Sequence, residues 1–297
     1  MADLSGDRNG NGRRNGDGDS GGPPVVVRDI AKSFGSQEVL KGVSFQVEGG
    51  ETLAVLGRSG TGKSVLLKLM IGLNKPDSGS LEIHGQDITR LERRQLDEAR
   101  KKMGFLFQQG ALYDSLTVEQ NVMFPLGRHT RMTESEQKKR ARELLQTVGM
   151  EKDGDKMPSQ ISGGMQKRVG LARALALDPD ILLFDEPTSG LDPITAEEIG
   201  RLIEDLKQQR HIASVVVTHD IHQARVFADR LLLLNEGRIV AEGSFDDLAS
   251  SEDEFVKRFM KQGRDQKGLG RRDPVRRANR RPVCRNRFWN GRRAWRD

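Results

Sequence analysis

Short apolar runs alternate with longer amphipathic segments along most of the chain, and this alternation sets the expected fold. Residues 52–56, 181–184 and 214–217 are nearly all apolar, as expected of strands that are buried on both faces of a sheet. The helices expected from periodicity and from apolar content span residues 63 to about 73, 132–149 and 171–177. Apolar strands separated by helices predict an α/β fold with a mainly parallel sheet covered on both faces.

Other short segments have the character of strands near turns. Residues 25–27 are apolar, residues 43–47 alternate between apolar and polar, and the cluster at residues 76–79 predicts a turn. Residues 231–234 and 238–240 are expected to form a closing hairpin. Ordered structure is therefore expected to begin near Val25.

The two ends of the chain lack this patterning. Residues 1–24 are mostly Gly, Asn and Asp, so they cannot bury enough apolar surface to offset their ordering entropy, and disorder is expected. Residues 264–297 are rich in arginine and contain Trp289 and Trp295. This tail is expected to be disordered, because blocks of like charge usually are; the alternative is a contact with anionic lipid or nucleic acid. The predicted folded domain is residues 25–263.

The net charge is unevenly distributed. The total is +6, but residues 264–297 carry +10 and residues 1–24 carry −1, which leaves −3 for residues 25–263. The basic isoelectric point near 9.5 is therefore a property of the tail, and it does not indicate a basic fold that binds nucleic acid.

Composition limits the compartments in which the protein is expected to work. The chain is 35% apolar and 31% charged with a mean hydropathy of −0.61, and no apolar run reaches the roughly 18 residues that span a bilayer. No apolar signal segment opens the sequence. Cys284 is the single cysteine, which excludes an intrachain disulfide and fits a reducing cytoplasm.

A glycine-rich loop follows directly from the expected strand at residues 52–56. It matches the pattern G-x-x-x-x-G-K-[ST] with Gly57, Arg58, Ser59, Gly60, Thr61, Gly62, Lys63 and Ser64. Its glycines let successive backbone N–H groups point at one phosphate, and the dipole of the following helix adds positive charge. Lys63 is expected to reach the outer phosphates and the Ser64 hydroxyl to bind Mg²⁺, the alternative being a chance glycine turn.

An acid pair ends the expected strand at residues 181–184. Asp185 lies where open α/β sheets bind ligands, and it is expected to hold Mg²⁺. Glu186 is expected to orient or deprotonate the attacking water. The alternative, a solvated strand end, is disfavoured because two acids behind a buried strand would be a costly exposure of charge near the core.

Four smaller features complete the candidate site, each with a plain structural alternative. Gln108 is a candidate to reach the metal and the water, or it is an ordinary loop glutamine. His219 is a candidate to bind the outer phosphate, although a lone histidine is more often structural. Asp192 belongs to a possible site turn or to an ordinary turn. Phe34 either stacks on a base or packs in the core.

A second candidate phosphate grip lies about a hundred residues after the first. Ser162, Gly163 and Gly164 come where a helix running toward Leu175 is expected to begin, with Ser162 as its cap. The alternative is a plain helix start.

The order of these features resembles the nucleotide-binding subunit of ABC transporters. The order is P-loop, Gln108, Ser-Gly-Gly, Asp-Glu, Ser-Gly-Leu-Asp and His219, and the resemblance runs from about Val25 to Phe259. It implies a P-loop NTPase fold with a RecA-like core, an antiparallel β subdomain at residues 25–50 and 79–88, and a helical subdomain at about 110–175. It also implies that the chain binds and hydrolyses ATP with Mg²⁺.

The resemblance assigns the second grip to another molecule. In that family two subunits pair head to tail, so that each nucleotide lies between the P-loop of one and the Ser-Gly-Gly turn of the other. Ser162, Gly163 and Gly164 would then hold the outer phosphate bound by a second copy of the chain, and Asp192 is also counted among the nucleotide-binding residues. ATP would join the dimer, and hydrolysis would loosen it.

The resemblance narrows to the Mce-associated lipid transporters, such as the phospholipid systems that maintain lipid asymmetry. Met165 in the signature turn and the loop at residues 107–118 are typical of that group. The implied partners are a membrane permease that docks near the Gln108 loop and an Mce-type lipid-binding protein, on the cytoplasmic face of a bacterial inner membrane. In contrast, the stretch at residues 185–192 follows the general ABC pattern, from which some members of the lipid group diverge.

Two alternatives remain open. The chain could energise another ABC transporter, for import of a small polar solute or for efflux. It could instead be a soluble ABC ATPase acting on nucleic acid, but one P-loop, one signature and no sustained heptads argue against that class, so no nucleic-acid partner is expected.

Overall fold

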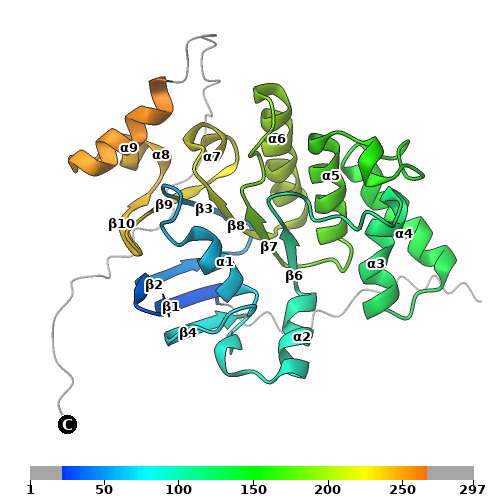
Figure 1. Cartoon of the computed structure of the whole chain (residues 1–297), viewed down its shortest axis with the longest axis horizontal. Helices are drawn as coiled ribbons and strands as arrows, with labels where there is room; N and C mark the ends of the chain where they lie inside the picture. The colour runs from blue at the N-terminus through cyan, green and yellow to red at the C-terminus, as the bar shows by residue number, and fades with distance from the viewer. Residues whose placement is uncertain (1–21, 266–297) are drawn as a thin grey trace, which may run out of the picture.

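The computed structural model describes residues 22–265, which form two β-sheets with helices around them (Figure 1). The larger sheet has six strands in the order β10-β9-β3-β8-β7-β6. These strands are β3 (Thr52–Leu56), β6 (Met103–Leu106), β7 (Ile181–Asp185), β8 (Ala213–Thr218), β9 (Arg230–Asn235) and β10 (Arg238–Gly243). All neighbours pair in parallel except β9 and β10, which form the predicted hairpin.

The smaller sheet is antiparallel, with the strand order β2-β1-β4-β5. Its strands are β1 (Val25–Phe34), β2 (Gln37–Val47), β4 (Ser78–Ile83) and β5 (Gln86–Asp87). Strands β1 and β2 are longer than residues 25–27 and 43–47, where strand character is evident in the sequence. The full length of β1 is not evident in the sequence because the pairing of β1 with β2 is irregular after Val27. Asp29 has a positive φ of 47° there, which interrupts the alternation of apolar and polar residues.

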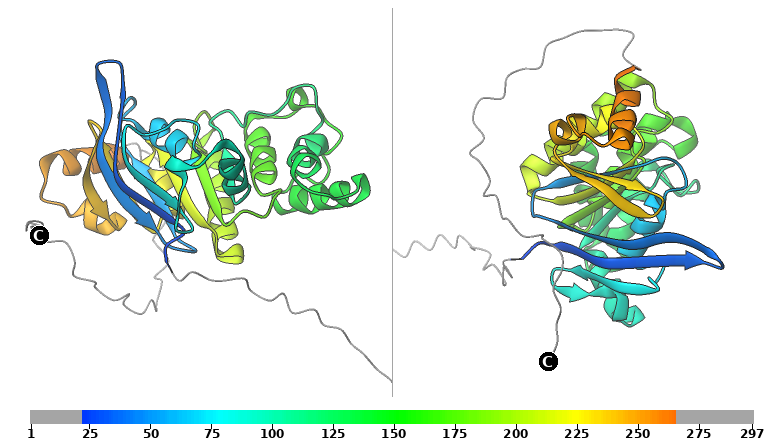
Figure 2. Two further views of the ribbon diagram at one scale, coloured as in Figure 1. Left: turned by 90° about the horizontal axis from the view of Figure 1, so that it is seen from below. Right: turned by 90° about the vertical axis from the view of Figure 1, so that its left-hand side faces the viewer.

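Helices cover both faces of the larger sheet, and three of them form a separate group. The helices are α1 (Lys63–Met70), α2 (Arg93–Lys101), α3 (Val118–His129), α4 (Glu134–Thr147), α5 (Gly163–Ala174), α6 (Pro193–Arg210), α7 (Ile221–Phe227), α8 (Phe245–Ala249) and α9 (Glu254–Asp265), with 3₁₀ turns at Ile88–Arg90 and Pro158–Gln160. Figures 1 and 2 show α3, α4 and α5 grouped to one side, away from the antiparallel sheet. This arrangement confirms the predicted fold class.

Helix α1 ends earlier than the sequence suggests. It was expected to reach about Leu73, but it ends at Met70 because Gly72 takes a positive φ of 66° and the Leu73 N–H turns back to the Lys68 carbonyl.

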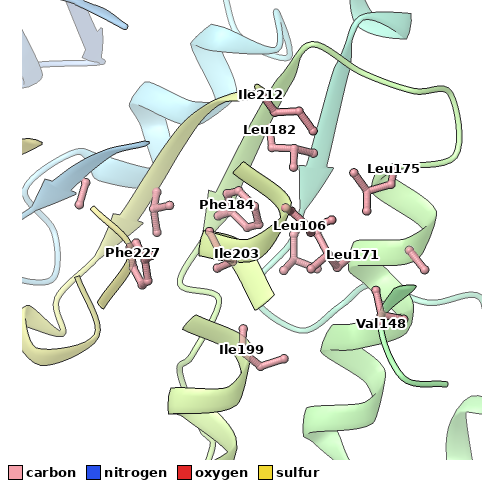
Figure 3. Close-up of a cluster of buried hydrophobic side chains, with 14 of the residues drawn as sticks. Leu106, Val148, Leu171, Leu175, Leu182, Phe184, Ile199, Ile203, Ile212 and Phe227 are labelled. Atoms are coloured by element: carbon pink, nitrogen blue, oxygen red, sulfur yellow. The ribbon is translucent and has the colours of Figure 1, made fainter. Parts of the chain in front are cut away.

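Side chains of the larger sheet alternate between two apolar cores. Leu53 and Val55 of β3 pack on one face with α1 and the antiparallel sheet, whereas Ala54 and Leu56 pack on the other with α3 to α9. Figure 3 shows the second core around Phe184, which lies close to Leu106. A sheet buried on both faces explains why its strands read as continuous apolar runs.

The expectations for residues 1–24 and 264–297 concern positions that lie outside the described residues, apart from the few at the edges of the range. Within residues 22–265, no helix combines the length and apolar character that crossing a bilayer requires.

Candidate functional site

The glycine-rich loop connects the buried strand β3 to the start of α1. Gly62 precedes α1 with a positive φ of 101°, and no side chain caps this helix. Its first N–H groups therefore have no side-chain partner, which suits a phosphate. A Cβ atom on Gly57 would lie 2.5 Å from the Leu234 carbonyl oxygen, so the loop can pass this close to β9 only with glycine there.

Lys63 lies under this loop with its ammonium directed back at the backbone. Its side chain is 7% exposed, and Nζ donates to the carbonyl oxygens of Gly57 at 2.8 Å and Arg58 at 3.0 Å. Burial lowers the pKa of Lys63, against the opposing pull of the Glu186 and Asp185 carboxylates. The lysine thus braces the loop and keeps a positive charge beside it.

Ser64 and Asp185 bring two oxygen ligands together. The Ser64 hydroxyl donates to Asp185 Oδ1 at 3.1 Å, which joins the first turn of α1 to the end of β7. Burial raises the pKa of Asp185, and the bond from Ser64 opposes this. Mg²⁺ is commonly held by one or two protein oxygens, with substrate phosphates and waters supplying the remainder. The pair fits that pattern, and the described residues hold no cluster of three or more His, Cys, Asp or Glu side chains that would make a protein-only cage.

Glu186 follows with its carboxylate held from two sides. Its Oε2 accepts a hydrogen bond from the Thr218 hydroxyl at 3.2 Å and lies 2.9 Å from His219 Nδ1. Its Oε1 lies 4.0 Å from Lys63 Nζ. The Glu186 side chain is 12% exposed and that of His219 is 61% exposed, so the histidine faces solvent while the acid is sheltered.

The structure therefore gathers five of the predicted residues at the carboxyl ends of β3, β7 and β8, the edge where α/β sheets bind ligands. These residues are Lys63, Ser64, Asp185, Glu186 and His219.

Gln108 lies in a different groove. With Gly163, Lys167 and the turn at residues 189–191 it lines a hollow of about 450 Å³, and its side chain makes no hydrogen bond within the described residues. Its predicted approach to the metal stays a prediction.

Asp192 and Phe34 belong to two other elements, α6 and β1. Asp192 caps α6, accepting from the N–H groups of Ile194 and Thr195, both at 3.1 Å. Phe34 ends β1 and is 49% exposed, which excludes core packing, and the Lys32 ammonium lies 5.4 Å from the centroid of its ring.

The Ser-Gly-Gly turn begins α5. Ser162 caps the helix through a bond from the Met165 N–H to its hydroxyl at 3.3 Å, while Ser162 and Gly163 are exposed. Gly164 is buried, and a Cβ atom there would lie 2.4 Å from Thr195 Cγ2 of α6. Met165 is half-buried against the apolar core. Close packing against α6 therefore explains the glycine at position 164, but packing does not explain the exposed Ser162 and Gly163.

Lys167 is a residue near the site that sequence reasoning did not single out. It is 4% exposed on α5, and its Nζ donates to the carbonyl oxygen of Glu186 at 3.0 Å. The only signal in the sequence was a lysine inside a helix expected to be packed on the core.

The loop after Gln108 is fixed to two helices. Arg173 of α5 donates to the carbonyl oxygens of Gly110 at 2.9 Å and Ala111 at 2.8 Å. Asn121 of α3 is fully buried and bonds the backbone of this loop at Tyr113, Leu116 and Thr117. Tyr113 and Phe124 stay exposed with ring centroids 4.6 Å apart, beside a groove of about 300 Å³. The clamped loop and α3 thus present one exposed aromatic side chain each, Tyr113 and Phe124.

Comparison with known proteins agrees with this geometry. The model of the ABC transporter family matches residues 40–189. The probable ribonucleotide transport ATP-binding protein mkl of Mycobacterium leprae is 43% identical, over 80% of this chain and 69% of that protein. The intermembrane phospholipid transport system ATP-binding protein MlaF of Haemophilus influenzae is 39% identical, over 80% of this chain and 90% of that protein. The methionine import ATP-binding protein MetN 2 of Enterococcus faecalis is 40% identical, over 81% of this chain and 71% of that protein.

Solved structures give the same picture. An ATP-binding cassette solved as a dimer in a post-hydrolysis state with ADP and Pi has a TM-score of 0.69 and 37% identity, over 74% of this chain and 98% of that one. The protein cbiO1 from Clostridium perfringens, part of the ABC transporter complex cbiONQ, has a TM-score of 0.71 and 28% identity. The match covers 82% of this chain and 99% of that one.

Proposed function

The chain belongs to the ABC transporter family and hydrolyses ATP to drive transport, and from this premise we propose that it powers the movement of phospholipid. In this proposal two copies sit on the cytoplasmic face of a bacterial inner membrane, beneath a permease that works with an Mce-type lipid-binding protein. The observation that carries the enzymatic part is the cluster of Lys63, Ser64, Asp185, Glu186 and His219 at one edge of the sheet.

The phospholipid cargo is supported by how fully the chain matches its relatives. The aligned part covers 90% of the phospholipid transport protein, but 69% of the ribonucleotide transport protein and 71% of the methionine import protein. A match along nearly the whole length favours equal domain content. Met165 and the loop at residues 107–118 favour the same group.

The nucleotide would be held by the P-loop. The backbone N–H groups of residues 57–64 would surround its phosphates, with Lys63 on the outer ones and Phe34 stacked on the base. Mg²⁺ would be held by Ser64 and Asp185, with Gln108 as a further ligand, and it would supply charge neutralisation at the phosphates.

Glu186 would receive the proton of the attacking water. Its carboxylate is sheltered and held by Thr218 and His219, so it is oriented before substrate arrives. His219 is exposed enough to reach the outer phosphate and would connect it to Glu186. Lys63, which approaches Glu186 Oε1, would place positive charge beside the transferred group.

Each nucleotide site would be completed by a second copy. Ser162 and Gly163 are exposed at the start of α5, where the helix dipole favours an anion, and no interaction joins them to the P-loop within residues 22–265. With Gly164 and Asp192 they would face the phosphate bound by the other copy. A head-to-tail dimer uses both grips.

The permease would dock on the face formed by the loop after Gln108. Exposed Tyr113 and Phe124, next to the groove of about 300 Å³, offer an apolar surface of the kind that accepts a helix. The bonds from Arg173 and Asn121 keep this surface in one shape.

The experiment is purification of the chain with its membrane partners from detergent-solubilised membranes, followed by mass spectrometry of bound small molecules. We expect enrichment of phospholipid and a permease with an Mce-type protein. Recovery of a different permease, with bound nucleotide or amino acid and no enriched lipid, would contradict the cargo.

Lys63→Ala tests the nucleotide site separately. We expect loss of ATP binding and hydrolysis by the isolated chain, measured by nucleotide affinity and phosphate release, because the variant removes the charge beside the loop. Unchanged ATP affinity and turnover would contradict the proposed site.

A further inference from the structure

Lys167 is a buried cation for which the roles proposed above give no use. It lies on α5, and its ammonium donates to the Glu186 carbonyl oxygen at 3.0 Å. Taking an ammonium out of water is costly unless the group is bound. Burial lowers the pKa of Lys167 to about 8, against the pull of Asp185 and Glu186. A methionine would fill the same space without this cost, so the cation needs a reason.

The carbonyl group that Lys167 binds belongs to Glu186, the proposed base, and it accepts several hydrogen bonds. The same Glu186 oxygen also accepts from the Ser189 N–H at 3.2 Å and the Ser189 hydroxyl at 3.1 Å. On the other side of the residue, the Glu186 N–H donates to the Val217 carbonyl at 2.9 Å. The backbone of Glu186 is therefore held at both of its polar groups.

This holding matters because Glu186 has an unfavourable backbone conformation. Its φ is +48°, in the left-handed region, where a residue with a Cβ atom is disfavoured by about 1–2 kcal/mol. Such a conformation persists only when its surroundings enforce it. The direction of the Cα–Cβ bond, and with it the reach of the carboxylate toward Thr218 and His219, depends on this backbone.

We propose that Lys167 is a positioning residue for ATP hydrolysis: its charge-assisted bond fixes the Glu186 peptide and so aims the carboxylate at the attacking water. This inference rests on the proposed role of Glu186. It also connects the two proposed phosphate-binding features, because Lys167 lies in the helix that Ser162 caps. A shift at the Ser162 turn, when it binds the phosphate held by a second copy, would reach Glu186 of its own subunit through α5.

The test compares Lys167→Met with Lys167→Arg in the full chain. We expect Lys167→Met to lower kcat by about ten- to a hundredfold, because small misplacements of a reacting group are that costly. The KM and the equilibrium affinity for ATP should stay within about twofold, since the hydrogen bond of the lysine goes to the Glu186 carbonyl oxygen and not to the P-loop. Lys167→Arg, which keeps a cation donor, should recover part of the lost kcat.

Lys207→Met provides the matched control. Lys207 of α6 is also buried, 7% exposed, but it pairs with two carboxylates, those of Glu204 at 2.5 Å and Asp229 at 2.9 Å. This variant should lower the unfolding temperature and leave kcat per folded molecule within about twofold. The two lysines would then separate a loss of turnover from a loss of stability.

A wild-type kcat in Lys167→Met would overturn the inference, and so would a loss confined to ATP affinity. If Lys167→Met does not fold, Lys167→Gln, which keeps a neutral donor, is measured in the same way. Glu186→Gln is run alongside. Normal turnover in Glu186→Gln would reject the proposed base, whereas loss of turnover there with normal Lys167→Met would reject the role of Lys167 alone.

Discussion

At the scale of single residues, the site combines a strained backbone with a sheltered carboxylate. The backbone of Glu186 has a positive φ. Its side chain is only 12% exposed, and its carboxylate accepts hydrogen bonds from Thr218 and His219. A carboxylate arranged in this way needs little reorganisation of its surroundings when it accepts a proton, which keeps that part of the activation free energy small.

Glu186→Gln should separate binding from hydrolysis. The amide keeps the size of the side chain and an acceptor for Thr218, but it cannot take a proton. We expect turnover to fall by about 10²- to 10⁴-fold with ATP affinity retained. Phosphate release and equilibrium nucleotide binding on the same preparation measure both. Turnover at the wild-type rate would mean that another group accepts the proton.

At the scale of elements, the approach of α5 to α6 depends on a missing side chain. Gly164 faces Thr195 so closely that a Cβ atom would lie 2.4 Å from its methyl group, whereas a Cβ atom on Gly163 would meet only Leu191 Cδ2 at 3.9 Å. The two neighbouring glycines therefore differ in their structural demand.

Gly164→Ala should destabilise the fold by about 1–3 kcal/mol, the usual cost of overpacking. Gly163→Ala should cost far less, and adding Thr195→Ser to Gly164→Ala should restore stability because it removes the clashing methyl. Chemical unfolding of the three variants measures this. Equal losses for both glycines would show that the helix approach is not the cause.

Elements that carry their own apolar pattern were predictable from the sequence. Strands β3, β7 and β8 read as continuous apolar runs, and the P-loop and the acid pair were recognisable from residue type and spacing. Strand β6 was not recognised because it has four residues, and its Gly104 is needed for close approach to Ala174 of α5. Helix α6 was missed although Asp192 and Pro193 are a capping signal. The left-handed Glu186 and the bond from Lys167 arise from tertiary contacts that no local pattern encodes.

At the scale of the whole molecule, one chain presents two separate features that we propose bind nucleotide. The P-loop lies with Asp185 and Glu186 at the end of the larger sheet, whereas the Ser162 turn begins α5 in the helical group (Figure 1). The clamped loop between Gln108 and α3 offers a third surface, toward the proposed permease. ATP binding that joins two chains would move the helical groups, and with them whatever is docked there.

The most direct test of this account is the mass of the Glu186→Gln chain in solution, measured by light scattering with and without Mg-ATP. We expect a rise from the monomer mass of 33.1 kDa to about twice that value on adding ATP. Adding Ser162→Arg, which places a bulky side chain at the second grip, should abolish the rise, and the same change in the otherwise unaltered chain should abolish turnover. A Ser162→Arg chain that stays monomeric and hydrolyses ATP at the full rate would show that a second copy is not needed to complete the nucleotide site.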